Sequence, residues 1–295
     1  MEGIAAGAKQ DVISIIALNV RTEIAYGLFD DGCTALAWQS TENSHLAQNW
    51  DWSTPQKANL LALRIKRSNK NHVITMITEA GIIGKIGLNS AGVGVCLNAI
   101  KAHGISYTRM PVHLALRVAL ECNGRDEFQA IVAKEGVAAA SHILIADALS
   151  GGLGIETSAK DIQYIVQGMK DKVLGRTPLD GIVTHTNHYL VLHRDIAEIL
   201  DLPDSIMRFQ RVGKLVEMAK AEGREPEMGM IERILKDEHG WPASINREET
   251  NGCRSETLFS VVMDLKRRKA IVKLGRPSHP EEVLELDPMA GIGDA

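Results

Sequence analysis

One cysteine of the sequence stands where a thiol could attack its own backbone. Cys33 follows Gly32 directly, at the predicted junction of a turn and a strand, and glycine lets the backbone approach the sulfur closely. Attack on the preceding carbonyl would shift the acyl group to sulfur. Hydrolysis would then expose Cys33 as a new N-terminus, whose α-amine, with an ordinary pKa of about 8, can serve as base for the thiol. A small buried hydrophobic side chain is the alternative.

A carboxylate and two indoles follow in the stretch 48–52. Two strands joined by a turn would return Asp51 to the side of the new amine, where a carboxylate can stabilise the ammonium form. Trp50 and Trp52 are candidates for the wall of a substrate pocket, with core packing as the alternative. Because Trp38 falls in the same stretch, three of the four tryptophans cluster near Cys33 in the sequence.

Three histidines close together in the sequence suggest a metal at first sight. His185 and His188 are three residues apart, and His193 follows. On a strand, however, His185 and His188 would point to opposite faces, and no acidic ligand is suitably spaced. We therefore expect structural histidines, with no metal and no cofactor. A metal-dependent hydrolase using His185 and His188 stays an alternative.

Periodicity predicts the elements that must position these residues. Apolar residues follow helical spacing in some segments and alternate in others, and turn residues separate them. Runs of strands, then helices, then strands favour one α+β layered domain over an alternating βαβ fold. Helices are predicted at 11–24, 111–124, 125–135, 205–222 and 227–239, and strands at 33–38, 60–66, 72–80, 93–100, 141–149, 162–166, 182–185, 257–265 and 270–274.

Six blocks of the sequence resemble one protein family, and they occur in the same order as in that family. This family is the acyl-coenzyme A:6-aminopenicillanic acid acyltransferases (isopenicillin N acyltransferases) of the N-terminal-nucleophile (Ntn) hydrolase superfamily. The cysteine block and the NWDW block together are specific, whereas the glycine-rich block alone is less so. The blocks are ALNVRTEI (17–24), DGCTALAW (31–38), AQNWDW (47–52), GKIGLNSAGVGVCLNAI (84–100), THTNHYL (184–190) and TLFSVVMDLKRR (257–268).

The resemblance implies a four-layer αββα sandwich that is made as an inactive precursor and cut between Gly32 and Cys33. Residues 1–32 would be a pro-segment, released or retained as a small subunit, and residues 33–295 the catalytic part. Family members usually carry a further stretch before the segment GIAAGAKQD, with which this chain opens.

The resemblance also implies roles for particular side chains. Asp51 becomes a site residue, and Asn187, whose uncharged amide can donate to a developing oxyanion, becomes the oxyanion-hole residue. An arginine before the last hairpin would hold a substrate carboxylate. The sequence leaves open whether this is Arg247 or Arg254.

Composition excludes several function classes. The 295 residues, 45% hydrophobic and 24% charged, are typical of a soluble globular protein. A formal charge of −4 and a pI near 6.2 give no positive field for nucleic acid or anionic lipid. We find no signal peptide and no run of about twenty apolar residues, and we expect a cytoplasmic protein.

The four cysteines show no close-pair spacing, so we expect separate thiols. Cys33 is the predicted nucleophile. Cys96 and Cys122 are predicted to be packed, and Cys253 to be exposed in a polar loop and open to oxidation.

The predicted function is amide hydrolysis of a peptide-like, N-acyl amino acid or β-lactam side-chain substrate through an acyl-cysteine. Transfer from acyl-coenzyme A is an alternative, as is an uncleaved, non-catalytic binding protein. The expected partners are the acyl substrate, the chain's own N-terminal fragment and, as an open possibility, further copies of the chain.

Overall fold

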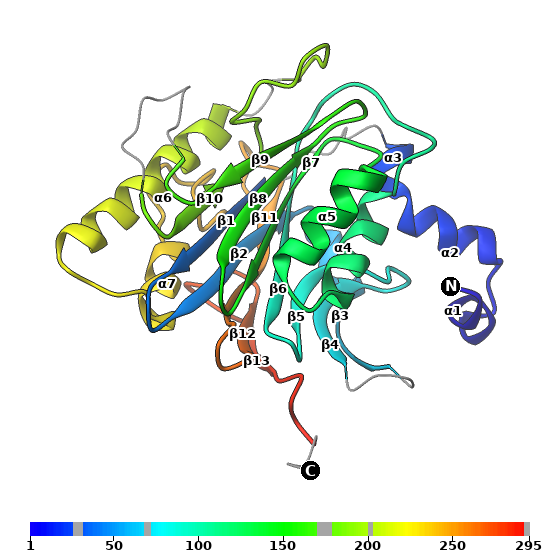
Figure 1. Cartoon of the computed structure of the whole chain (residues 1–295), viewed down its shortest axis with the longest axis horizontal. Coiled ribbons are helices and arrows are strands. Elements are labelled where there is room, and N and C mark those ends of the chain that lie inside the picture. The colour runs from blue at the N-terminus through cyan, green and yellow to red at the C-terminus, as the bar shows by residue number, and fades with distance from the viewer. Residues whose placement is uncertain (26–31, 68–71, 170–178, 200–202, 292–295) are drawn as a thin grey trace.

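The computed structural model describes residues 1–25, 32–67, 72–169, 179–199 and 203–291. Two antiparallel sheets lie face to face at its centre (Figure 1). The first sheet contains, in spatial order, β10 (Ile182–His185), β1 (Gly32–Gln39), β2 (Ser44–Trp52), β11 (Glu256–Asp264), β12 (Lys269–Leu274) and β13 (Glu282–Leu286). The second contains β3 (Leu60–Lys66), β4 (Val73–Glu79), β5 (Ile86–Asn89), β6 (Val93–Ala99), β7 (Ser141–Asp147), β8 (Gly151–Thr157) and β9 (Ile162–Val166).

Helices cover the outer face of each sheet. α6 (Pro203–Ala221) and α7 (Met228–Leu235) pack on the first sheet, and α4 (Val112–Glu121) and α5 (Arg125–Glu135) pack on the second (Figure 1). A 3₁₀ helix, η1 (Thr54–Asn59), joins β2 to β3. The predicted four-layer αββα sandwich is thus confirmed.

Alternation along β1 divides its side chains between two cores. Cys33, Ala35 and Ala37 belong to the core between the sheets, whereas Leu36 and Trp38 pack under α6 and α7. Trp38 is therefore separated in space from Trp50 and Trp52, although the three cluster in the sequence. The thiol of Cys33 faces the second sheet.

The N-terminal segment reaches the second sheet through polar anchors. It contains α1 (Glu2–Ala8), α2 (Val12–Asn19) and α3 (Arg21–Ile24). Asn19 ends α2: its Nδ2 donates to the carbonyl of Gly81 (2.8 Å), and its Oδ1 accepts from the N–H of Ile83 (2.9 Å). The single helix predicted at 11–24 is therefore two helices, because this side chain binds the turn before β5.

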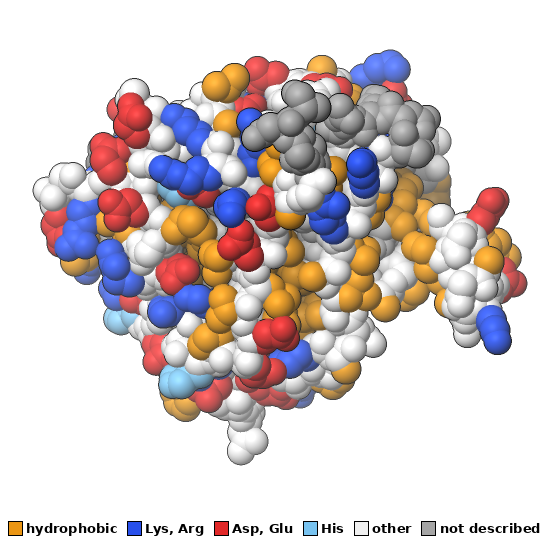
Figure 2. Space-filling view, turned by 90° about the horizontal axis from the view of Figure 1, so that it is seen from below, with side chains coloured by type: hydrophobic (Ala, Val, Ile, Leu, Met, Phe, Trp, Pro, Cys, Tyr) orange, Lys and Arg blue, Asp and Glu red, His pale blue; other side chains and the backbone are white. Residues whose placement is uncertain are grey.

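The arm formed by α1 and α2 projects from the body (Figures 1 and 2). Ile13 and Ile16 on α2 are exposed, at 68% and 43%. Hydrophobic side chains also gather on the body where it faces this arm (Figure 2). In the part of the chain that the structure describes, no helix is long and apolar enough to cross a membrane.

The prediction missed α1, β5, β8 and β13 as separate elements, and it expected β2 only as the second strand of the hairpin that returns Asp51. β8 begins Gly-Gly-Leu-Gly, which hides its alternation. A Cβ at Gly152 would lie 2.5 Å from that of Ala37, and one at Gly154 would lie 2.7 Å from Nε2 of His142. Glycine is favoured at 152 because β1 of the facing sheet approaches closely, and at 154 because the His142 ring of the neighbouring strand β7 covers the position. The stretch 170–178, for which neither a helix nor a strand is predicted, lies outside the described residues.

Candidate active site

Cys33 is the second residue of β1, at the end where β1 begins to pair with β2. Its register partner is Trp50, and side chains directly opposite on antiparallel strands share a face of the sheet. The residue is 1% exposed. The thiol and the Trp50 indole therefore lie side by side between the two sheets.

The backbone of Cys33 is held on both sides by side chains from distant parts of the chain. Its N–H donates to Oδ1 of Asn187 (2.8 Å), and its carbonyl accepts from Nη1 of Arg208 (2.6 Å). Arg208 also donates from Nη2 to the same Oδ1 (2.9 Å). Asn187 and Arg208 thus fix the position of the predicted cleavage point.

Arg208 contacts Cys33 and Asn187 in this candidate site, and the sequence did not indicate it. It is 1% exposed although it lies on α6 among charged residues, and Asp204, one turn earlier, accepts from its Nε at 3.1 Å. The sequence does not indicate that Arg208 is buried, because the helix contains several other basic residues of the same kind. Only the packing of α6 on β1 and β10 places it against Cys33.

Asp51 lies on the opposite face of β2 from Trp50, next to Gly32, its register partner. Its Oδ1 accepts from the hydroxyl of Thr257 (2.7 Å), and Nε of Arg247 lies 3.3 Å from its Oδ2. Burial raises the pKa of Asp51 to about 6, although Arg247 and Arg208 oppose this shift. The carboxylate lies beside Gly32, next to the bond that is predicted to be cut.

Gly32 has no room for a side chain. A Cβ there would lie 2.8 Å from both Oδ2 of Asp51 and Nε of Arg247. Any larger residue would displace this buried ion pair, so glycine is required by close approach and not by its backbone angles.

Arg247 and Arg254, between which the sequence left a choice, are placed very differently. Arg247 is 5% exposed and contacts Asp51, Asp204 and Cys253, whereas Arg254 is exposed. Nη1 of Arg247 donates to Sγ of Cys253 at 3.1 Å. The prediction that Cys253 is exposed is therefore wrong: it is 5% exposed, because its loop folds over Arg247.

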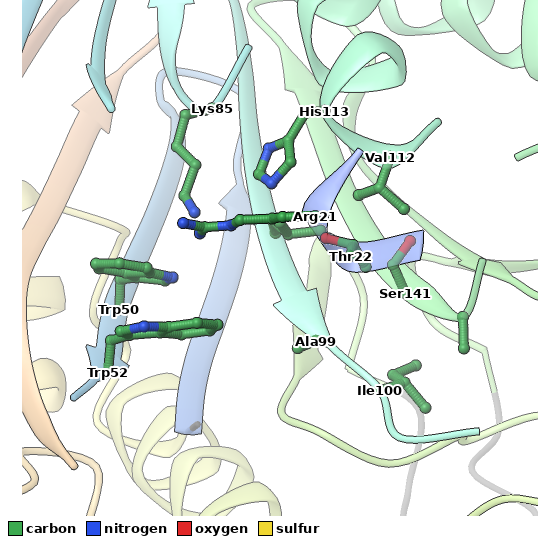
Figure 3. Close-up of a pocket in the computed structure, with 12 residues that line it drawn as sticks. Arg21, Thr22, Trp50, Trp52, Lys85, Ala99, Ile100, Val112, His113 and Ser141 are labelled. Atoms are coloured by element: carbon green, nitrogen blue, oxygen red, sulfur yellow. The ribbon is translucent and has the colours of Figure 1, made fainter. Parts of the chain in front are cut away.

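Trp50 and Trp52 line a cavity between the sheets (Figure 3). Their rings stack with centroids 5.3 Å apart. Lys85, Arg21, Thr22 and His113 also line it, so one wall comes from the N-terminal segment. This cavity lies on the thiol side of β2.

The three histidines weighed as metal ligands have protein partners. His185 lies 2.9 Å from Oε1 of Glu156, and His193 lies 2.6 Å from Oδ1 of Asp161. His188 lies 2.8 Å from the hydroxyl of Ser205. Among the residues with described positions, no group of three or more His, Cys, Asp or Glu side chains could hold a metal ion.

Arg208 gives a stability prediction with a control on the same helix. We expect Arg208→Met to lower the free energy of unfolding by about 3 kcal/mol, because it removes one partner of a buried charge network. Arg211→Met breaks a more exposed pair with Asp237 (2.6 Å) and should cost less than about 1 kcal/mol. Urea denaturation measures both. Equal losses would contradict the role given to Arg208.

Comparison with solved structures identifies the class of the fold. A variant of conjugated bile acid hydrolase from Clostridium perfringens matches with a TM-score of 0.58 and 14% identity, covering 86% of this chain and 92% of that one. Penicillin V acylase from Agrobacterium tumefaciens matches with a TM-score of 0.54 and 11% identity, covering 88% and 86%. The fold is that of the N-terminal-nucleophile hydrolases.

Sequence comparison then gives the family. The model of the family "Acyl-coenzyme A:6-aminopenicillanic acid acyl-transferase" matches residues 38–279. The acyl-coenzyme A:6-aminopenicillanic-acid-acyltransferase 40 kDa form of Emericella nidulans is 40% identical over 285 residues, which are 95% of this chain and 75% of that protein. The chain belongs to this acyltransferase family and is an enzyme.

Proposed function

We propose that the chain is a cysteine N-terminal-nucleophile enzyme that cuts itself between Gly32 and Cys33 and then carries acyl groups on Cys33. One observation supports this most strongly. Cys33 lies opposite Trp50, which lines the cavity, the amide nitrogen that cleavage would free donates to Oδ1 of Asn187, and Asp51 lies beside Gly32. Nucleophile, amine and carboxylate meet at the start of one strand.

Self-cleavage begins with attack of the Cys33 thiol on the carbonyl carbon of Gly32. The C–N bond breaks as the C–S bond forms, and the nitrogen of Cys33 takes the proton and becomes a free amine. Water then hydrolyses the thioester, leaving a carboxylate on Gly32 and the thiol on Cys33. Asp51 stabilises the ammonium form of the new amine.

Turnover uses the freed α-amine as the base. It takes the thiol proton while sulfur attacks the carbonyl of an acyl substrate, and the leaving amine or thiol receives that proton. Nδ2 of Asn187 donates one N–H to the carbonyl of Ala99 (3.0 Å), so its second N–H can serve the oxyanion together with a backbone N–H. Water or an amine then takes the acyl group from Cys33.

The proposed substrates are amides of the N-acyl amino acid, peptide-like or β-lactam side-chain type, with acyl-coenzyme A thioesters as alternative donors. The family name supports an acyl donor and an amine acceptor. Hydrolysis and transfer differ only in whether water or an amine receives the acyl group.

We further propose that residues 1–32 stay bound after cleavage as a small subunit. Asn19 holds the turn before β5, and Oε1 of Glu23 accepts from the N–H of Val112 (2.8 Å) at the start of α4. These contacts do not depend on the bond between Gly32 and Cys33.

Trapping of the acyl-enzyme tests this function. Purified protein incubated with an activated acyl amide should gain the mass of one acyl group on the peptide that begins with Cys33. Iodoacetamide should abolish turnover, whereas EDTA should leave it unchanged. Loss of activity with EDTA and resistance to iodoacetamide would favour the metal-dependent alternative and overturn the proposal.

A further inference from the structure

The segment that carries Asn187 has no regular secondary structure of its own. β10 ends at His185, and residues 186–193 form neither a helix nor a strand. Most of this segment is nevertheless buried or half-buried. A helix or sheet ladder therefore does not place the backbone around Asn187, and the buried N–H groups of the segment need other acceptors. These acceptors decide how precisely the Asn187 amide is held.

A carboxylate from the second sheet accepts two of these N–H groups. Glu156 is fully buried on β8, which lies next to β10 (Figure 1). Its Oε1 accepts from the N–H of Leu190 (2.6 Å), and its Oε2 accepts from the N–H of Val191 (3.1 Å). Oε1 also lies 2.9 Å from Nε2 of His185, at the other end of the segment. Glu156 thus bridges the two sides of Asn187.

Glu156 is ionised, so both of its oxygens can accept these bonds. Burial raises its pKa, but the hydrogen bond from His185 and the nearby His193 ring outweigh burial, and the net result is a pKa of about 2. A carboxylate offers two acceptor oxygens, whereas an amide of the same shape offers one oxygen and one donor group. Glutamine at this position would therefore leave one side of the segment without its acceptor.

A hydroxyl from α6 holds the backbone of Asn187 itself. The N–H of Asn187 donates to Oγ of Ser205 (2.8 Å), which is also fully buried. Oγ of Ser205 donates in turn to Oγ1 of Thr186 (3.0 Å). The same helix brings Nη2 of Arg208 to Oδ1 of Asn187 (2.9 Å). The segment is thus held from two layers of the fold, the second sheet and the helices that cover the first.

We propose that Glu156 and Ser205 are positioning residues that hold the Asn187 amide where it can donate to the oxyanion. This inference rests on the proposed function, because it takes Asn187 as the oxyanion-hole residue. Both residues act through Asn187 and not on the substrate. A site of this kind needs its groups placed to within about 0.5 Å, and a shift of about 1 Å can lower the rate by a factor of about 10². Loss of either anchor should therefore lower kcat and leave substrate binding largely unchanged.

A double-mutant cycle with Asn187 tests the inference. With the N-pentanoyl amide of 4-nitroaniline as substrate, we expect Glu156→Gln to lower kcat per cleaved chain by about 10–100-fold and to change KM by less than about twofold. In the Asn187→Ala background the same substitution should cause no further loss, because the amide that it positions is already absent. Equal losses of kcat in both backgrounds would show that Glu156 acts independently of Asn187 and would overturn the inference.

Asp147→Asn is the matched control. Asp147 is a buried carboxylate at the opposite end of the hairpin formed by β7 and β8, where its Oδ1 accepts from the N–H groups of Leu149 (2.9 Å) and Ser150 (2.5 Å). This variant should lose stability, as Glu156→Gln does, but keep its kcat per cleaved chain. An equal fall of kcat in both variants would assign the effect to stability and contradict a positioning role.

Ser205→Ala keeps the inference testable if Glu156→Gln does not fold. The substitution removes one hydroxyl and leaves the N–H of Asn187 without its acceptor. We expect kcat per cleaved chain to fall by about tenfold, and this loss should also disappear in the Asn187→Ala background. An unchanged kcat would exclude Ser205 as a positioning residue.

Hydrogen exchange separates this inference from the proposed reaction, because it needs neither substrate nor cleavage. In the Cys33→Ala protein, Glu156→Gln should speed amide exchange in the peptide that covers residues 186–193, whereas Asp147→Asn should not. Unchanged exchange in that peptide would overturn the inference and leave the proposed reaction standing. Faster exchange, together with an unchanged kcat in Asn187→Ala, would uphold Glu156 as the anchor and overturn the proposed role of Asn187 instead.

Discussion

The Cys33→Ala protein should remain a single chain, whereas the wild type should separate into chains of residues 1–32 and 33–295. The thiol is the only group of residue 33 that can accept the acyl group of Gly32, and alanine removes it without adding bulk to a site that is 1% exposed. Intact-mass spectrometry after prolonged incubation measures the outcome. The same variant should show no turnover, because both steps use one sulfur.

Cys122→Ala is the matched control for this experiment. Cys122 is also buried, at 2% exposed, but it lies at the end of α4, where its Sγ donates to the carbonyl of Val118 (3.2 Å). We expect this variant to be cut like the wild type. An uncut wild type that still hydrolyses amides would show that the N-terminal-nucleophile mechanism does not operate, and a cut Cys33→Ala protein would show that another group performs the cleavage.

Asn187→Ala should lower kcat by about 10²–10³-fold in protein that is already cleaved, the loss typical of removing one oxyanion-hole donor. Alanine removes the Nδ2 donor and also the Oδ1 acceptor that binds the N–H of Cys33. We therefore expect slower self-cleavage as well. Turnover must be expressed per cleaved chain, which active-site titration with an activated acyl substrate provides.

Asn49→Ala is the control, since Asn49 is an equally buried amide on β2. Its Nδ2 donates to the carbonyls of Leu235 (2.8 Å) and Ile245 (2.9 Å), on the helix side of the sheet. This variant should lose stability but keep its kcat per cleaved chain. An unchanged kcat in Asn187→Ala would remove the oxyanion role, and an equal loss in both variants would show that the effect is one of stability.

The local hydrophobic pattern predicted most of the strands and helices, because the sequence of each segment shows the alternation of a strand or the spacing of a helix. The pattern failed where contacts with residues distant in the sequence determined the conformation. The glycines of β8 leave room for Ala37 of the facing sheet and for His142 of the neighbouring strand, and the break after Asn19 is made by a side chain that binds a turn far along the chain. The spacing of residue types in the sequence predicts neither contact.

The residues of the candidate site also fall into two groups: some were indicated by the sequence, and others were identified only by the fold. A thiol directly after glycine pointed to Cys33, and the family resemblance then implied Asp51 and Asn187 as its partners. Which arginine joins them is a question of burial: Arg247 is enclosed beside Asp51 and Cys253, while Arg254 is exposed. Similar arginines in one loop cannot be told apart without the fold.

The sequence by itself indicated the family and gave Cys33 as the predicted nucleophile, since both depend on short, ordered runs of residue types. Tertiary structure alone decided the electrostatic surroundings of the site. Arg208 is buried against Cys33 only because α6 packs on β1, and Arg21 joins Lys85 and Glu79 only because α3 lies against the second sheet. Charges act through distance and burial, and both are properties of the folded chain.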